Sequence, residues 1–391
     1  MQASFVRNAI VLGLVTAIGP FAIDMYLPAL PSVARDLGTD QAGALSSMTM
    51  FFNAFAIGQL VYGPSSDLLG RRRPLIAGLA LFLLASVGCA LATTLDQLLV
   101  FRLIQGFGGA AGMVVARAIV RDLHSGVDEA RLLSLLMLVF SVSPILAPLA
   151  GNGVIAVTSW RGVFWLVGAL AVIDVVMIVL FVPETRPPGA RGDARLADLI
   201  PACRVLVTDR NFLRLTLVSA FTFSGFLLFL ANSPFVLSQH YGMSRLEYSL
   251  AFSANAVAFF AAAQLNGGLA QRFGLPRLLG PAVLGFAATM TLVAGLAALG
   301  LDGFVVVSAL LFVGYGFLGI IMPVASVLAL EDHGAIAGTA ASLMSAVQLA
   351  TGSLCVAISG RFADGSVVPM LAAIAGVGLI ALVLQLVLGR P

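Results

Sequence analysis

Long apolar segments occupy most of this 391-residue chain and constrain its fold more than any other feature. A helix that crosses a membrane needs about 20 mainly apolar residues. The segments that meet this requirement are 8–30, 41–66, 74–94, 98–121, 130–156, 160–181, 211–237, 245–271, 277–299, 304–330, 335–361 and 367–388. Apolar and polar residues do not alternate along them, which argues against a transmembrane β-barrel. The sequence therefore predicts an all-α integral membrane protein with twelve spanning helices.

The composition also predicts a membrane location. The chain is 60% hydrophobic and 10% charged, whereas soluble domains are about 25% charged. The net charge of +3 does not indicate a nucleic-acid partner, because the arginines lie between the apolar segments rather than on one face. The N-terminal residues lead directly into a span longer than a signal-peptide core, so we expect an uncleaved first helix.

One stretch, 183–210, is rich in proline, glycine and charges of both signs, and it separates two sets of six segments. We therefore expect an N-terminal six-helix bundle over 1–182, a cytoplasmic linker over 183–210 and a C-terminal six-helix bundle over 211–391. The halves share a weak repeat, in which residues 63–75 align with 267–279. A parallel repeat of this kind predicts two bundles related by a pseudo-two-fold axis along the membrane normal, with a central cavity between them.

The arginines predict the orientation, because positive residues concentrate on the cytoplasmic side of a membrane. With a cytoplasmic N-terminus, the outer side receives Arg35, Arg161, Arg245 and Arg361. The inner side receives the six arginines between 186 and 214, together with Arg7, Arg71, Arg72, Arg73, Arg117, Arg121, Arg131, Arg272, Arg277 and Arg390. We therefore expect both termini in the cytoplasm.

An acid lies inside the first apolar segment. Asp24 is surrounded by apolar residues, and a carboxylate in hydrocarbon costs several kcal/mol unless it faces a partner, water or a proton. We interpret Asp24 as a proton-binding group of a secondary transporter. Asp174 is the other acid in such a position. It has no evident partner in the sequence, so a second proton site and a local structural role are both open.

The stretch GQLVYGPSSDLLGRRRP, 58–74, resembles the signature loop between the second and third helices of the major facilitator superfamily. Within that superfamily, this stretch, DMYLPALP at 24–31 and PET at 183–185 are similar to the proton-coupled drug antiporters of the bicyclomycin-resistance type. The resemblance implies a bacterial inner-membrane protein, a monomer, and a charge latch at the cytoplasmic surface formed by Asp67, Gly70 and Arg71. Arg121 and Asp122 either join this latch or anchor the fourth helix.

The stretch 101–122 is similar to the family's fourth helix, in which an intramembrane arginine precedes a Gln-Gly pair. Arg102 and Asp24 lie at comparable distances from the outer ends of their antiparallel helices. An arginine is permanently charged, so its approach to Asp24 would favour proton release. We therefore expect Asp24 and Arg102 to form a proton-coupling pair, with Gln105 bonded to either. The alternative for Arg102 is snorkelling to the interface.

The stretch SVSPILAPLAGNG, 141–153, resembles the antiporter motif of the family's fifth helix. Ser143 and Ala147 stand where that pattern has glycine, while Gly151 and two prolines remain. The family's version is associated with export, so this departure leaves the direction of transport open. The prolines would kink the helix, and packing is an adequate alternative explanation for the motif.

The resemblance places the first, second, fourth and fifth helices of each half around a substrate cavity. The aromatic, methionine and neutral polar residues expected there are Tyr26, Asn53, Gln105, Met137, Phe140, Asn232, Phe235, Asn255, Phe259 and Gln348. Such side chains accommodate varied apolar ligands. The second half has no charge within its helices, so we expect the first half to handle protons.

Three functional classes follow from these observations. The first is an exporter that exchanges small amphipathic compounds or drugs for protons by alternating access, with the proton gradient as its energy source and no cofactor. The second is a proton-coupled symporter that takes up a nutrient or metabolite. The third, an integral-membrane enzyme, is disfavoured, because no catalytic cluster, metal-ligand spacing or phosphate-binding loop occurs in the sequence.

Overall fold

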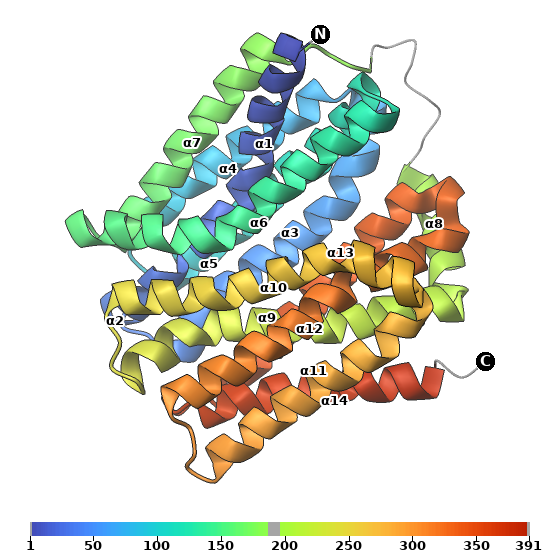
Figure 1. Cartoon of the computed structure of the whole chain (residues 1–391). Helices are drawn as coiled ribbons and strands as arrows, with labels where there is room; N and C mark the ends of the chain where they lie inside the picture. The colour runs from blue at the N-terminus through green and yellow to red at the C-terminus, as the bar shows by residue number, and fades with distance from the viewer. Residues whose placement is uncertain (1, 187–195, 389–391) are drawn as a thin grey trace. The chain divides into compact units, whose positions relative to one another are not determined.

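The computed structural model describes residues 2–186 and 196–388, and every regular element in these ranges is a helix (Figure 1). The main helices are α1 (Gln2–Asp24), α2 (Leu30–Asp36), α3 (Gln41–Leu69), α4 (Arg72–Leu91), α5 (Leu95–Leu123), α6 (Gly126–Val157), α7 (Trp160–Phe181), α8 (Leu196–Thr208), α9 (Arg210–Gln239), α10 (Arg245–Phe273), α11 (Leu275–Ala298), α12 (Phe304–Leu330), α13 (Ala337–Gly360) and α14 (Val368–Leu388). Within the described ranges, 12 helical spans are long and apolar enough to cross a membrane. The predicted all-α membrane fold is confirmed.

The first span is interrupted directly after Asp24. Helix α1 ends at that residue, a 3-10 turn follows over Leu27–Ala29, and α2 begins at Leu30. Pro28 lies inside the turn, and Pro31 lies at the start of α2. Proline lacks an N–H and cannot continue the ladder of helical hydrogen bonds. The sequence thus places Asp24 where the backbone leaves the helix.

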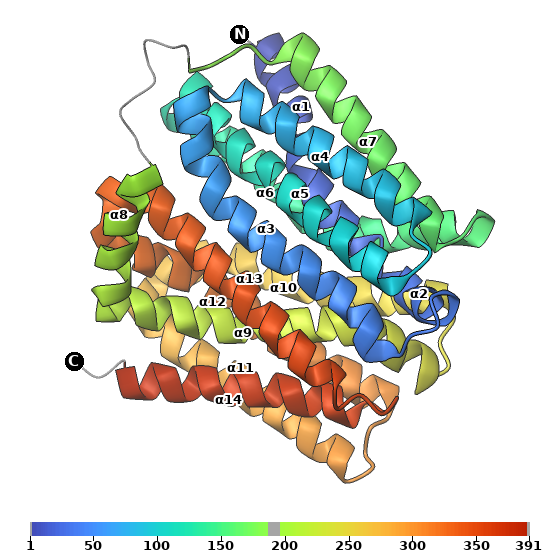
Figure 2. The ribbon, with the colours of Figure 1, turned by 180° about the vertical axis from the view of Figure 1, so that it is seen from behind.

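Contacts between helices divide the chain into two compact units. Unit 1 comprises residues 1–39 and 46–201, and unit 2 comprises 40–45 and 202–391. In unit 1, α1 lies between α6 and α7 (Figure 1), and α4 packs against α5 and α7 (Figure 2). In unit 2, α9 packs against α12, α13 and α14.

The predicted linker, 183–210, contains the helix α8, which the sequence analysis did not anticipate. This helix has only 13 residues and includes Pro201. Its helical pattern of apolar residues is therefore short, and the charged residues on either side make the pattern hard to recognise in the sequence. Residues 187–195 of the predicted linker lie outside the described residues.

The weak repeat corresponds to two short turns that each place a glycine at a positive φ angle. Gly70 separates α3 from α4 in unit 1, and Gly274 separates α10 from α11 in unit 2. Their φ angles are +87° and +78°, a region that side chains disfavour and glycine enters freely. The same requirement for a positive φ angle therefore explains the aligned glycine in both halves.

Close approach of backbones explains several other glycines in unit 1. A Cβ atom on Gly112 would overlap the carbonyl oxygen of Val15, and one on Gly106 would overlap that of Phe51. A Cβ atom on Gly151 would overlap the carbonyl oxygen of Met25. Small residues at such places let membrane helices pack backbone against backbone. Gly151 therefore brings α6 directly against the turn that follows Asp24.

This packing gives a matched pair of variants two residues apart on α6. We expect Gly151→Ala to destabilise the protein by about 1–3 kcal/mol, because the new methyl group has no room. Gly153→Ala should leave stability unchanged, because no heavy atom lies within 4 Å of its Cβ position. Thermal unfolding of both proteins in detergent would check this, and equal melting temperatures would contradict the packing argument.

Candidate functional site

The carboxylate of Asp24 is enclosed within unit 1. The residue is 4% exposed, and the hydroxyl of Ser143 on α6 donates a hydrogen bond of 3.0 Å to its Oδ2. Ser143 itself has no exposed surface. The acid that the sequence singles out is therefore held in the protein interior by a neutral donor rather than by an ion pair with a described residue.

Arg102 on α5 is also fully buried. Its Nη1 donates to Oε1 of Gln105 at 2.7 Å and to the carbonyl oxygen of Ala22 at 3.4 Å. Its guanidinium lies 4.7 Å from the ring centre of Tyr26 and 4.4 Å from that of Phe51, within the range of cation–π attraction. The snorkelling alternative does not fit an arginine with no exposed surface.

The predicted ion pair between Asp24 and Arg102 is not formed in this structure. Arg102 nonetheless contacts the same helix, because its Nη1 bonds the carbonyl of Ala22, two residues before Asp24. Nη2 of Arg102 has no hydrogen-bond partner among the described residues. A buried N–H without a partner is costly, so this atom is a ready donor for a carboxylate that comes within reach.

Two further hydrogen bonds hold the arginine in place. Gln105 donates from Nε2 to the hydroxyl of Ser86 on α4 at 2.8 Å. The hydroxyls of Tyr26 and Ser47 are 2.9 Å apart. Gln105 and Tyr26 both have no exposed surface, so in this structure these two predicted cavity residues pack around the arginine in the core of unit 1.

Residues predicted to form a charge latch cluster around Arg71, which follows Gly70 in the turn between α3 and α4; the cluster is called the latch below, and its role as a latch stays a prediction. Nη1 of Arg71 bonds Oδ1 of Asp67 at 2.6 Å. Nε and Nη2 grip both oxygens of Asp122, at 2.8 and 3.3 Å, which is the strong two-point geometry of arginine and carboxylate. Burial alone would lower the pKa of Arg71, but Asp122 and Asp67 together raise it above its ordinary value.

Arg121 does not take part in this network. Its side chain is exposed and forms no ion pair with a described residue. The second guanidinium is instead that of Arg186, which bonds Oδ1 of Asp67. Helix α5 thus contributes Asp122 to the latch, while Arg121 points elsewhere because consecutive helical residues face different directions.

The segment Glu184–Arg186 completes the latch, and the sequence analysis missed its role. The carboxylate of Glu184 accepts from the backbone N–H groups of Arg71, Arg72 and Arg186, at 2.8, 3.2 and 2.9 Å. It therefore caps the first turn of α4, where N–H groups lack helical partners. The hydroxyl of Thr185 donates to Asp122 at 2.9 Å. The PET motif was the available signal, but sequence alone did not place it beside Gly70.

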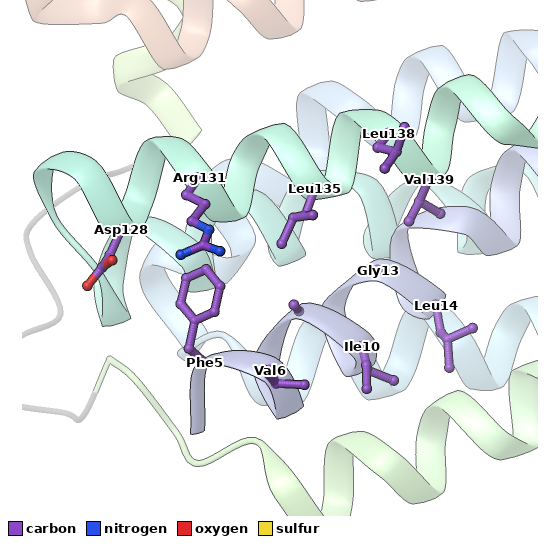
Figure 3. A pocket seen from close by; sticks show the side chains of 11 residues that line it. Phe5, Val6, Ile10, Gly13, Leu14, Asp128, Arg131, Leu135, Leu138 and Val139 are labelled. Atoms are coloured by element: carbon purple, nitrogen blue, oxygen red, sulfur yellow. The ribbon is translucent and has the colours of Figure 1, made fainter. Parts of the chain in front are cut away.

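A groove of about 670 Å³ runs along α1 and α6 at the ends that carry Phe5 and Arg131 (Figure 3). Its walls are mainly apolar, and the guanidinium of Arg131 stacks 5.5 Å from the ring centre of Phe5. Asp128 lies at the same end of the groove. The groove is amphipathic, with its charges at one end only.

The other predicted cavity residues fall into two groups. In unit 1, Asn53 is exposed and Met137 is 40% exposed, while the side chain of Phe140 lies outside what the structure describes. In unit 2, Asn232 donates to Ser359 at 3.2 Å and Gln348 donates to Ser219 at 3.1 Å. Phe235 and Asn255 are buried, and Phe259 is half-buried. The Oδ1 atom of Asn255 has no hydrogen-bond partner among the described residues. Their role in a cavity stays a prediction.

Asp174 on α7 is 3% exposed. Within the described part of the chain, its carboxylate has neither a hydrogen bond nor an ion pair. Buried charges are normally paired, so Asp174 is the least satisfied acid in unit 1. Its role as a second acid stays a prediction.

The arrangement of spanning helices and the buried charges are those of a membrane transporter, and known proteins identify its family. The model of the Major Facilitator Superfamily matches residues 12–360, and the chain belongs to this family. It is similar to the Multidrug resistance protein MdtL of Escherichia fergusonii, with 31% identity over 95% of this chain and 93% of the relative. It is also similar to the Bicyclomycin resistance protein homolog of Haemophilus influenzae, with 28% identity over 92% and 90%.

Solved structures show the same fold. A D-xylose-proton symporter superposes with a TM-score of 0.80 at 18% identity, covering 97% of each chain. The chain is therefore a multi-pass membrane transporter for small molecules and not an enzyme. The resemblance inferred from residues 58–74 is confirmed.

The latch predicts a large difference between two neighbouring arginines. Arg71→Gln leaves Asp67 and Asp122 without their shared cation, so we expect a loss of about 1–3 kcal/mol in unfolding free energy. Arg73→Gln is the control, because Arg73 is exposed and surface changes usually stay within about 0.5 kcal/mol. Thermal unfolding in detergent at low and high salt would measure both, and equal losses would contradict the latch geometry.

Proposed function

We propose that the protein exports small amphipathic compounds in exchange for protons, with Asp24 as the proton carrier. One observation carries this proposal. Asp24 is a carboxyl in a membrane-spanning segment, is 4% exposed and accepts from the neutral donor Ser143. Removing a charged carboxylate from water costs free energy. The balance between the charged and the protonated form of Asp24 therefore depends strongly on the groups around it.

Arg102 supplies the second half of the proposed switch. When its guanidinium approaches Asp24, the charged carboxylate is stabilised and the proton leaves; when it withdraws, the neutral acid is favoured. In this structure, Arg102 forms no ion pair with Asp24 and is bonded to Gln105. In this scheme its Nη2, which has no hydrogen-bond partner among the described residues, is the atom that would bond the carboxylate. The proton gradient supplies the energy in this scheme, and no cofactor is required.

The proposed direction of transport rests on the relatives. Two of them are named for resistance to bicyclomycin and to multiple drugs, and resistance by a transporter implies removal of the compound from the cell. The symporter noted above shares the fold at 18% identity, which says nothing about direction. Uptake of a nutrient with protons is the alternative outcome of the transport test.

The groove between α1 and α6 supports amphipathic substrates. Apolar walls over most of its length and charged groups at one end suit a molecule with an apolar body and a polar end. Arg131 and Asp128 lie near the start of α6, which the arginine distribution assigns to the cytoplasmic side. We propose that compounds enter here from the cytoplasm or the inner leaflet.

The same arginine bias supports an inner-membrane protein with both termini in the cytoplasm. The latch around Arg71 would then lie at the inner surface and would close that side in one state of the transport cycle. We propose that a single chain carries out this cycle, because both units of the family fold belong to it.

The proton-carrier proposal makes a direct prediction. In everted vesicles, Asp24→Asn should abolish accumulation of an exported dye driven by a pH gradient, because the amide cannot release a proton. Asp96→Asn, at an exposed position in the first turn of α5, is the control and should transport normally. Undiminished, gradient-dependent accumulation by the Asp24 variant would contradict the proposal, and efflux from these vesicles on energisation would indicate uptake.

Asp174 provides a separate prediction. A buried carboxyl without a described partner is most stable with a proton bound, and we propose it as a second proton-binding acid. We expect Asp174→Asn to lower the number of protons exchanged per substrate in proteoliposomes, where both fluxes can be counted. An unchanged ratio would restrict Asp174 to a structural role.

A further inference from the structure

The hydrogen bond between Ser143 and Asp24 joins two helices at a buried point. Ser143 lies on α6, and Asp24 lies at the end of α1. The donor Oγ and the acceptor Oδ2 are 3.0 Å apart, and the residues are 0% and 4% exposed. It is the one hydrogen bond that the carboxylate of Asp24 receives from the part of the chain that the structure describes.

Nothing in the motif of the fifth helix requires this hydroxyl. Ser143 occupies a position where the related pattern has glycine, which could not donate a side-chain hydrogen bond. Pro144 follows directly and Pro148 lies one turn later, both inside α6, so the backbone ladder beside Ser143 is interrupted. Two turns later, Gly151 seats α6 against the carbonyl of Met25. The hydroxyl therefore lies at a weakened turn of α6, next to a tightly packed contact with α1.

The strength of this bond depends on the proton state of Asp24. A hydroxyl bonded to an ionised carboxylate forms a charge-assisted bond that is roughly twice as strong as a neutral one. When Asp24 takes up a proton, the same contact becomes neutral and weaker. Proton binding therefore loosens one tie between α1 and α6, and proton release tightens it.

We propose that Ser143 is a positioning residue that stabilises the charged form of Asp24 and ties α6 to α1 while Asp24 lacks its proton. This inference rests on the proposed function, because it assigns a regulator to the same acid. Through Ser143, the protonation state of Asp24 acts on α6, which also lines the apolar groove. The proton-binding acid and the candidate substrate path are therefore both in contact with α6.

Several other ionisable groups lie on the elements packed around α1. Arg102 of α5 bonds the backbone of Ala22, and Tyr26 lies in the turn. The remaining groups are Asp96, Arg117, Arg121 and Asp122 of α5, Asp36 of α2 paired with Arg161 of α7, Asp174 of α7, and Asp128, Glu129 and Arg131 near the start of α6. None of these groups donates a hydrogen bond to Asp24. Among the described residues, no second donor would therefore compensate for the loss of the Ser143 hydroxyl.

Removal of the hydroxyl should shift the pH dependence in one direction. Without Ser143, the charged form of Asp24 loses a stabilising donor while the neutral form loses less, so proton release requires a higher pH. Loss of one such bond corresponds to a shift of about one pH unit, or a tenfold change in proton affinity. A purely structural role in packing would lower the amount of folded protein without moving the midpoint.

The experiment is a pH titration of the full-length protein in detergent, followed by the carboxyl band in infrared difference spectra and by export in everted vesicles. Asp24→Asn identifies the band. We expect Ser143→Ala and Ser143→Gly to move both midpoints upward by about one pH unit, and Ser143→Thr, which keeps the hydroxyl, to restore the original value. Ser326→Ala is the control, because that hydroxyl bonds the carbonyl of Met322 in its own helix.

The outcomes separate the inference from the proposed function. If Asp24→Asn removes the band and abolishes driven export but Ser143→Ala titrates like the unaltered protein, the role of Ser143 is overturned and the proton carrier stands. If Asp24→Asn keeps driven export, the proposed function itself fails. A shift produced equally by Ser143→Thr would also overturn the inference, because the hydroxyl would then be irrelevant.

Discussion

The cost of burying charge away from bulk water is the constraint on which the interior of unit 1 depends. A spanning helix satisfies its backbone by itself, but a charged side chain inside it must find partners within the protein. Arg102 finds them in Gln105, two backbone carbonyls and three aromatic rings. Among the described residues, Asp24 finds one hydroxyl. In the proposed function, this difference would hold the arginine in place and leave the acid able to respond to a proton.

The interior charges and the cytoplasmic latch are built on the same two helices. Helix α5 carries Arg102 and Asp122, and α3 carries Asp67 together with the Ser47 carbonyl that accepts from Arg102. Arg102 and Asp122 are twenty residues apart on α5, which is about 30 Å along a helix axis. Because a helix transmits displacement as a rod, movement of α5 against α3 would change both clusters. In the proposed function, this shared framework would be a physical route between proton binding and closure at the inner surface.

The two units share a glycine turn but not chemistry. Gly70 and Gly274 both have a positive φ angle, whereas the buried polar residues of unit 2 include Asn232 and Gln348, which bond neighbouring hydroxyls instead of charges. A duplicated scaffold can therefore confine the costly charges to one half. In the proposed function, the other half would be free to contact compounds of varied structure without the electrostatic demands of a proton carrier.

The sequence by itself determined the helical membrane fold, the spans, the family and the identity of the buried acid, because length, hydropathy and the cost of charge in lipid are local properties. It also determined the latch residues Asp67 and Arg71, which lie one helical turn apart. Tertiary structure decided the partners that come from distant segments. It gave Asp24 a hydroxyl from α6 rather than the expected Arg102, and it gave the latch Glu184 and Arg186 rather than Arg121. Those choices depend on how helices pack and which way their side chains face, and no spacing along the chain encodes them.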